Sequence, residues 1–238
     1  MELYSNKNMK LTPAQIDQLY TFTKQHYVEY YDLQTELVDH LANAIELEWE
    51  SNPTLSFETL LNKEFKKFGV FGFMDVVEEK QKAMNKIYNK LVWGHFKTFF
   101  KLPQIIGTIL SIFLVFKLLG SFAISHDIAA GIALLLLISF WAGLIRMNKK
   151  RKQIAKDNGK KWLLNEIIYG YSSLAGMSYL PIQLFLHFEN NSSQIMLFFM
   201  SLFIVSIIII EYIIFFIIPS KAQDYLEKTY PEYQLSNQ

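Results

Sequence analysis

The run from Arg146 to Lys161, RMNKKRKQIAKDNGKK, constrains the fold of this chain more than any other stretch. Eight of its sixteen residues are Lys or Arg, and a long apolar segment lies on either side of it. Basic residues in short loops stay on the cytoplasmic side of a membrane. The run therefore predicts a cytoplasmic loop between two transmembrane helices. A patch that binds nucleic acid or anionic lipid is the competing interpretation. The flanking apolar segments favour a topology determinant, with contact to lipid headgroups as a by-product, and leave little room for nucleic acid.

Four apolar segments follow the first hundred residues, at about 103–124, 128–146, 162–187 and 195–218. At 1.5 Å per residue, each can cross a hydrocarbon core of ~30 Å. The short connections after the first and third segments contain no Lys or Arg, whereas basic residues flank the other ends. We therefore expect a four-helix transmembrane bundle (102–218) in the lipid bilayer of a cytoplasmic or inner membrane, with both termini cytoplasmic. Trp141 and Trp162 are expected at the membrane interface beside the basic loop.

The chain ahead of these segments is polar. Residues 1–101 hold 12 Lys and 14 Asp or Glu, a net charge of −2, whereas residues 102–238 hold 11 Lys or Arg and 8 Asp or Glu, a net charge of +3. This contrast predicts an N-terminal cytoplasmic domain at 1–88. The aromatic and basic end of a long amphipathic helix, 89–101, is expected at the headgroup boundary, and 219–238 as a cytoplasmic tail. The first ten residues have no apolar core, so no cleavable signal peptide is expected.

Capping signals divide the N-terminal domain into helices. Thr12, followed by proline, starts a helix predicted over about 13–30. Asp32 is expected to cap a second helix, whose apolar stripe repeats at helical spacing. Ser56 is expected to cap a third helix that ends near residue 68 at Gly69. The predicted fold class is therefore all-α throughout, with helices in both the domain and the membrane part.

Short motifs in this domain resemble the HAAS-type helical domains. They are the run ELVDHL at 36–41, the pattern Phe65-x-x-Phe68-Gly69, and a fourth helix that begins near Asp75. The resemblance covers about residues 12–85 and departs from the family at 69–72, where the family more often has a Gly-Asp-Pro-like turn. HAAS-type domains are bacterial modules that precede membrane helices and are associated with PadR-type transcription regulators. The resemblance implies a signalling or regulatory accessory membrane protein.

Three ionisable residues lie inside the apolar segments, where a charge costs roughly 2.5 to 3.5 kcal/mol at a helix centre. Lys117 and Glu166 are each near enough to a segment end to reach the headgroups, which is their structural interpretation. Glu211 lies in the run IIIIEYIIFFII, so we expect it to be protonated or cation-bound. Because Glu166 and Glu211 are placed at nearly the same depth, they are candidates for an ion or proton site, which Asn165 and Tyr169 would complete.

Glu36 and His40 are four residues apart on one helix face, the spacing of a pair of metal ligands. No third ligand at such spacing accompanies them, so we expect no metal site. Together with Asp39 they are instead candidates for binding a protein partner.

Known catalytic signatures are missing from the sequence. It contains no phosphate loop, no G-x-S-x-G and no H-E-x-x-H, and its zero cysteines exclude thiolate chemistry. We therefore expect no enzyme activity and no cofactor. Two hypotheses remain: a non-catalytic regulatory or scaffolding membrane protein with a protein partner, and a small ion or proton transporter or channel subunit. The small-residue pairs Ala129/Ala133 and Ser172/Gly176 suit packing within the chain, and a homo-oligomer is left open.

Overall fold

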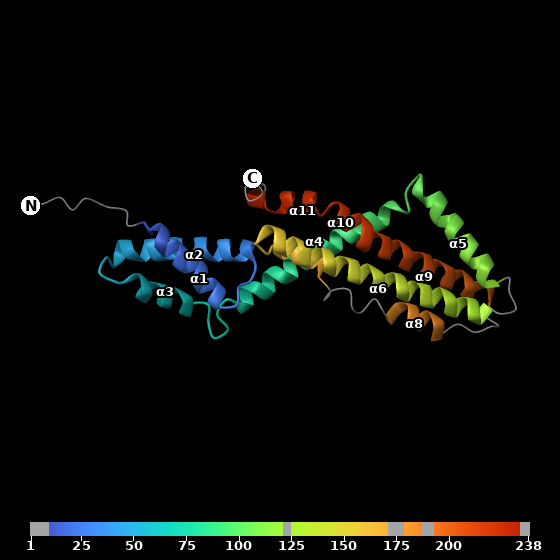
Figure 1. Cartoon of the computed structure of the whole chain (residues 1–238), viewed down its shortest axis with the longest axis horizontal. Coiled ribbons are helices and arrows are strands. Elements are labelled where there is room, and N and C mark those ends of the chain that lie inside the picture. Colours follow the sequence, from blue (N-terminus) through green and yellow to red (C-terminus); the bar gives the residue numbers. More distant parts are fainter. Residues whose placement is uncertain (1–9, 121–124, 171–178, 187–192, 234–238) are drawn as a thin grey trace, which may run out of the picture. The chain divides into compact units, whose positions relative to one another are not determined.

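The computed structural model describes residues 10–120, 125–170, 179–186 and 193–233. Within these residues every regular element is a helix and none is a strand, so the all-α expectation is confirmed. The chain divides into two compact units (Figure 1). The first contains residues 1–84 together with 160–163, and the second contains 85–159 and 164–238. The domain boundary expected at residue 88 lies near this division, but the inclusion of 160–163 in the first unit was not expected.

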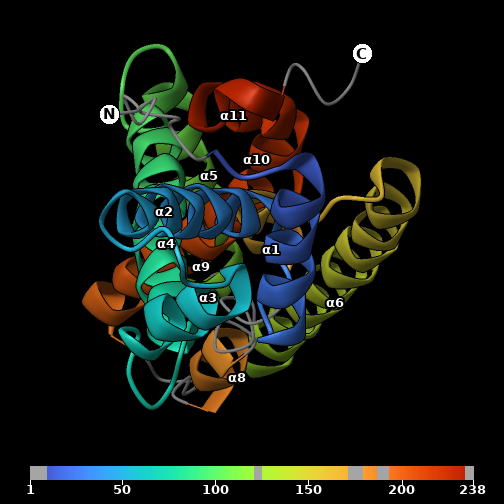
Figure 2. The ribbon, with the colours of Figure 1, turned by 90° about the vertical axis from the view of Figure 1, so that its left-hand side faces the viewer.

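The first unit is built from α1 (Pro13–Gln25), α2 (Tyr31–Ser51), α3 (Phe57–Lys66) and the first part of α4 (Met74–Thr98). Figure 2 shows α1, α2 and α3 close together, and α2 packs against both of the others. Thr12 forms a capping box with Gln15, and the Ser56 hydroxyl accepts from the Thr59 N–H, so both predicted caps are confirmed. Fully buried side chains from all four helices or their ends make the core: Leu19, Leu33, Leu41, Ile45, Leu60 and Phe73.

Helix α1 ends five residues earlier than predicted. Tyr27 takes a left-handed backbone conformation, with φ of 64°, and its N–H bonds to the Lys24 carbonyl. The N–H of Val28 bonds to the Thr23 carbonyl, and the Val28 side chain is buried. These two bonds form a Schellman motif. The sequence did not reveal it because the motif usually has a glycine where this chain has tyrosine.

A cluster of aromatic rings joins α1 to the end of α3 and the turn before α4. Phe65 lies 5.1 Å from Phe22, 4.3 Å from His26 and 4.9 Å from Phe73, measured between ring centroids. Tilted and edge-to-face contacts at these distances are favourable beyond the apolar area that they bury. The ring of Phe65 is therefore held on several sides, and it cannot move freely to admit a new neighbour.

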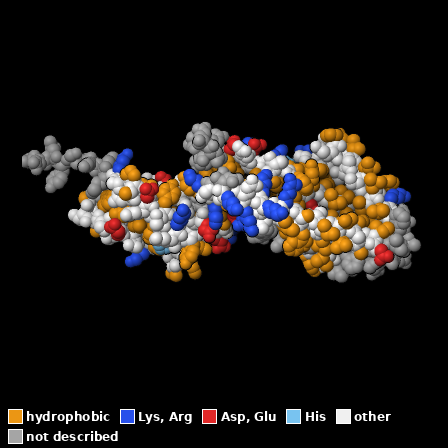
Figure 3. Space-filling model, viewed as in Figure 1, with side chains coloured by type: hydrophobic (Ala, Val, Ile, Leu, Met, Phe, Trp, Pro, Cys, Tyr) orange, Lys and Arg blue, Asp and Glu red, His pale blue; other side chains and the backbone are white. Residues whose placement is uncertain are grey.

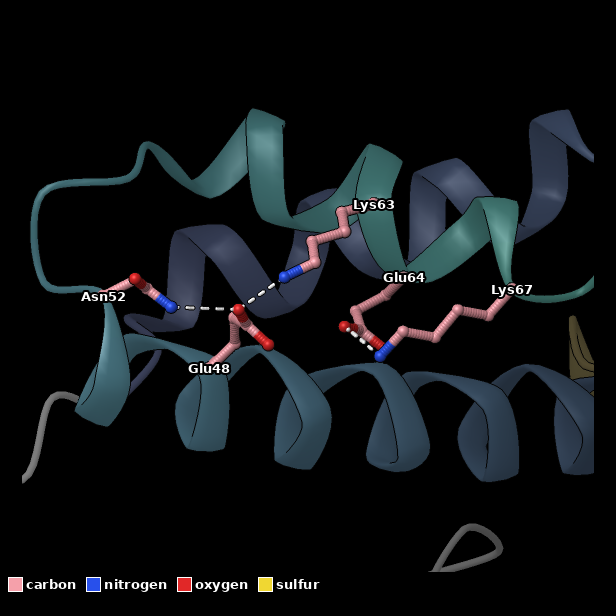
Figure 4. A network of polar contacts seen from close by, with 5 residues as sticks. All are labelled: Glu48, Asn52, Lys63, Glu64 and Lys67. Atoms are coloured by element: carbon pink, nitrogen blue, oxygen red, sulfur yellow. Dashed lines mark hydrogen bonds and ion pairs between the residues drawn. The ribbon is translucent and has the colours of Figure 1, made fainter.

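Charged side chains connect α2 with α3 on the surface of this unit (Figure 4). Lys63 lies 2.5 Å from Glu48, which also accepts from the Asn52 amide at 3.1 Å. The hydrogen bond from Lys63 lowers the pKa of Glu48 below its ordinary value. A second pair, Glu64 with Lys67 at 2.6 Å, lies one turn along α3. The Lys63–Glu48 pair is partly exposed, so it contributes little to the stability of the helix pair. The Glu64 side chain is buried, and its pair with Lys67 lies at the end of α3.

The second unit contains the apolar helices. They are α5 (Gln104–Gly120), α6 (Ser125–Asn158), α7 (Leu163–Tyr169), α8 (Tyr179–Leu186) and α9 (Gln194–Tyr212), followed by a π-helical turn, η2 (Ile213–Ile217), α10 (Ile218–Ser220), α11 (Ala222–Thr229) and the 3₁₀ turn η3 (Pro231–Tyr233). α5 packs along α9, and α6 contacts α5, α8 and η2. Ala129 is buried against Leu119, Leu197 and Ile204, so its expected packing within the chain is confirmed. Ser172 and Gly176 lie outside the described residues.

Among the described residues, two helical stretches are long and apolar enough to cross a membrane, Asp127–Lys156 and Gln194–Ser220. α5 is apolar but has only 17 residues. The third predicted segment, 162–187, is described only as α7 and α8, because 171–178 and 187 lie outside the described residues. Figure 3 shows hydrophobic side chains covering much of the visible surface over the apolar helices. Exposed side chains such as Ile106, Phe113, Leu135, Ile138 and Phe199 belong to these helices.

The basic run is not a loop. α6 continues through it to Asn158 and stops at Gly159, whose φ is +60°. Lys, Arg, Gln and Ala all favour helix, and nothing in the run breaks one before the glycine. The prediction of a loop over 146–161 was therefore wrong, and the connection from α6 to α7 shrinks to Gly159–Trp162.

Two glycines in the turn after α3 provide a matched test of this fold. Gly69 and Gly72 both have positive φ, 79° and 55°. A Cβ at Gly69 would meet nothing within 4 Å, whereas a Cβ at Gly72 would lie 2.8 Å from the Phe65 ring. Gly69→Ala should therefore lower the free energy of unfolding by about 1–2 kcal/mol, the conformational cost alone. Gly72→Ala should lower it by about 1–3 kcal/mol more, because the packed ring must also move.

Denaturant unfolding of the two variants, followed by the fluorescence of Trp49 in the buried core of the first unit, measures this difference. Equal losses of stability in the two variants would contradict the close approach of Gly72 to Phe65.

Candidate functional site

The connector, Lys160–Leu163, is held in the first unit by two hydrogen bonds that backbone amides donate at helix starts. The N–H of Tyr31, the first residue of α2, donates to the Lys161 carbonyl at 2.7 Å. The N–H of Leu163, the first residue of α7, donates to Asp32 Oδ1 at 3.1 Å. First-turn amides have no partner within their own helix. The Lys161 carbonyl therefore supplies an acceptor for the first amide of α2, and the Asp32 side chain supplies one for the first amide of α7.

Side chains add to this contact. The ammonium of Lys161 lies 2.8 Å from the Glu29 carboxylate, and Lys160 lies 3.9 Å above the Tyr31 ring. The Trp162 ring meets the Tyr31 ring at 5.3 Å and is only 2% exposed. Trp162 was expected as a membrane anchor, and that prediction was wrong because the ring is buried against Tyr31. Cation–π and edge-to-face contacts of this kind give the connector a defined place.

Asp32 does not have its predicted role. α2 begins at Tyr31, so Asp32 lies inside the first turn and its side chain caps α7 instead of α2. The carboxylate is buried, and its Oδ1 accepts from the Leu163 amide. Capping signals in a sequence indicate only the local helix. For this reason they gave no sign that a carboxylate near residue 32 serves an amide 131 positions later.

Glu211, the most buried of the candidate intramembrane charges, faces α6. Its Oε2 lies 2.5 Å from the Ser139 Oγ, which also lies 3.0 Å from the Leu136 carbonyl oxygen. A hydroxyl has a single hydrogen, and a carbonyl can only accept. When the carboxyl of Glu211 is protonated, it donates its hydrogen to Ser139 Oγ, and the Ser139 hydroxyl donates its own hydrogen to the Leu136 carbonyl. The protonated state stays a prediction, and this geometry favours it.

Glu166 has a different partner. Its carboxylate forms an ion pair with the Arg151 guanidinium, including a contact of 3.0 Å from Nε to Oε2. Ser139 and Arg151 are twelve residues apart on α6, about 18 Å along a helix axis. The two carboxylates thus interact with separate levels of α6. Their placement at nearly one depth was counted from the inner ends of the third and fourth apolar segments, and it stays a prediction.

The remaining candidates are also apart. Lys117 is exposed on α5, with its ammonium 5.8 Å from the Phe113 ring centroid. Asn165 is half-buried on α7. Tyr169 is buried, donates to the Pro219 carbonyl at 3.3 Å, and has Lys150 5.4 Å from its ring centroid. The structure therefore brings together Glu211 with Ser139, and Glu166 with Arg151, rather than one cluster of five.

The partner-binding candidates lie on the exposed face of α2. Glu36 pairs with Lys80 of α4 at 2.5 Å, and Asp39 accepts from the Asn43 amide. The His40 ring lies 5.9 Å from the Phe68 ring. Among the described residues no three His, Cys, Asp or Glu side chains gather closely enough to hold a metal ion.

Arg151, Ser139 and Asp32 are the residues that sequence reasoning missed. Arg151 was hidden among eight basic residues that had all been assigned to a loop. Ser139 had a detectable signal, because a hydroxyl within an apolar span often bonds to a neighbouring helix. Asp32 had none, since its partner is a backbone amide.

Comparison of the chain with known protein families, with curated proteins and with solved structures finds no match.

Glu211 yields a prediction about its protonation state. Glu211→Gln keeps the shape and the hydrogen bond to Ser139, so thermal stability in detergent should change by no more than about 1 kcal/mol in equivalent free energy. Glu211→Lys places a cation at a buried position without an assured partner and should cost on the order of several kcal/mol. A Gln variant as unstable as the Lys variant would show that the carboxyl is ionised.

Proposed function

We propose that this protein is a non-catalytic regulatory membrane protein, in which a cytoplasmic helical domain binds a protein partner and controls the connector between two membrane helices. The observation that carries the proposal is the reciprocal capping of α2 and α7. A domain that only anchored a partner would have no need to hold residues 160–163. A change in the first unit that weakens these bonds would free the start of α7.

The length of α6 supports a cytoplasmic position for the first unit. The apolar and basic stretch Asp127–Lys156 has 30 residues, about 45 Å of helix, whereas a hydrocarbon core is ~30 Å thick. The excess is long enough to carry the basic end beyond the membrane, on the side that retains positive charge. We place the connector and both chain termini there, with α5, α6, 164–187 and α9–α10 as the four spans of an inner-membrane bundle.

An exposed turn next to α3 suits a partner surface. Val70 is 97% exposed and Phe71 is 71% exposed, although both side chains are apolar. The neighbouring Phe68 contacts His40, so the turn is close to the candidates on α2. Exposed apolar side chains that are grouped with polar ones are typical of protein interaction sites. The partner that fits this surface has its own apolar patch with a basic rim opposite Asp39.

The alternative function is an ion or proton pathway, and the contact between Glu211 and Ser139 is the observation that favours it. A buried carboxyl bonded to a hydroxyl across two helices is a common element of proton relays. Flux measured in liposomes separates the two functions. A pathway requires flux that Glu211→Gln changes, whereas the regulatory function requires none.

The partner surface predicts a site-specific cross-link. A photoreactive phenylalanine analogue at Phe71 of the full-length protein in cells should attach one protein as a discrete adduct, because this side chain would lie in the interface. The same analogue at Leu47, which is 67% exposed on α2, is the control. Identical adducts at both positions, or none at Phe71, would contradict a specific partner at this turn.

The topology predicts the outcome of reporter fusions. Reporters placed after Lys156 and after Gln238 should be cytoplasmic, and one after Asn191 should be periplasmic, because the basic end of α6 stays inside. A periplasmic reporter after Lys156 would overturn the four-span arrangement.

A further inference from the structure

Two neighbouring cavities in the second unit differ in chemistry. One, of about 420 Å³, has Arg146, Lys150 and Tyr169 among its lining residues. The other, of about 490 Å³, is lined mainly by apolar side chains of α6 and α9, together with Ser139 and Glu211. Both are lined by Arg146, Tyr212, Phe215 and Phe216, so they adjoin along the face where α6 meets η2. A polar cavity continuous with an apolar one suits an amphiphilic ligand.

The first cavity is suited to an anion. Arg146 and Lys150 are four residues apart on α6 and therefore share a helix face. The guanidinium of Arg146 lies 5.2 Å from the Phe216 ring centroid, and Lys150 lies 5.4 Å from that of Tyr169. No carboxylate is among the residues that line this cavity. Two cations held over aromatic rings, without a lining acid, are an arrangement that binds phosphate.

The second cavity is suited to a hydrocarbon chain. Leu136, Ala142, Gly143 and Ile208 form apolar parts of its lining. Gly143 is needed at this point, because a Cβ there would lie 2.6 Å from the Phe215 ring. Phe215 belongs to the π-helical turn η2, and π-helical turns inside α-helices occur frequently at functional sites.

The sequence position of the cavities fits the membrane interface. Trp141, exposed on α6, lies about one turn before Arg146, and tryptophan prefers the interface. In the proposed arrangement Arg146 and Lys150 are then at the level of cytoplasmic headgroups, and the apolar cavity is at the level of the acyl chains.

We infer that these cavities bind one anionic phospholipid of the cytoplasmic leaflet, with its phosphate on Arg146 and Lys150 and an acyl chain between α6 and η2. This inference rests on the membrane placement proposed above and not on a protein partner. The bound lipid would fill the space beside Glu211 and Ser139, and so exclude water from that pair.

Native mass spectrometry of the full-length protein in mild detergent, titrated with phosphatidylglycerol or phosphatidylcholine, tests the site. Phosphatidylglycerol should bind with one-to-one stoichiometry and with higher affinity than phosphatidylcholine. The double variant Arg146→Gln/Lys150→Gln should lose at least about tenfold in affinity, since each basic residue contributes ~1 kcal/mol toward anionic lipid. Lys149→Gln/Lys152→Gln removes the same charge from exposed residues outside both cavities and should lose much less.

A third variant tests the acyl chain. Ala142→Leu adds bulk to an exposed position in the apolar cavity. The variant protein should therefore still fold, but it should bind phosphatidylglycerol more weakly than the wild type does. Inorganic phosphate alone should compete poorly in the wild type.

Three outcomes would overturn the proposal: equal losses in the two double variants, unchanged binding in Ala142→Leu, or displacement of the lipid by inorganic phosphate alone. Equal losses would mean that lipid is attracted to positive charge in general. Unchanged binding in Ala142→Leu, or displacement by inorganic phosphate, would mean that the site binds phosphate without an acyl chain. A wrong membrane placement can be distinguished from a wrong lipid site, because the reporter after Lys156 tests the placement independently of lipid binding.

Discussion

The hydrogen bonds between Asp32 and the Leu163 amide, and between the Tyr31 amide and the Lys161 carbonyl, are the interactions on which the functional account depends. Both amides begin helices and would otherwise lack a protein acceptor. A carboxylate at a helix start also interacts favourably with the positive end of the helix dipole. Loss of Asp32 as an acceptor would therefore leave a buried donor unsatisfied, which typically costs about 1–3 kcal/mol.

These bonds hold the connector in the first unit, although the chain on both sides of it belongs to the second unit. Leu163 belongs to the first unit, and the next residue, Leu164, belongs to the second, where its N–H donates to the Tyr230 hydroxyl at 3.2 Å. Successive amides at the start of α7 are thus satisfied by residues of different units.

The sequence predicted the parts of the fold that local signals determine. Thr12 and Ser56 mark helix starts correctly, because a cap acts within one turn of its own helix. Helix α3 ends at Lys66, earlier than the left-handed Gly69 predicted. Tyr27 was missed because tyrosine rarely adopts that conformation. The extension of α6 was missed because charge was taken as a sign of a loop, although Lys and Arg are good helix formers.

The candidate site was predicted less well, for a different reason. Glu211 was identified by its apolar surroundings in sequence, yet its partner Ser139 depends on how two apolar helices pack. Glu166 was grouped with Glu211 because depth was counted from segment ends, whereas its ion-pair partner Arg151 lies on a helix that runs through the expected loop. Side-chain partners across helices are set by packing, which periodicity alone does not specify.

Hydrogen exchange at the Leu163 amide in the full-length protein tests the central claim most directly. The account predicts slow exchange in the wild type, clearly faster exchange in Asp32→Ala, and no change in Asp39→Ala, which removes an exposed carboxylate from the same helix. Exchange at Leu163 that is as fast as in an unstructured peptide, or that is unchanged in Asp32→Ala, would contradict the hydrogen bond from Leu163 to Asp32 and with it the proposed control of the connector.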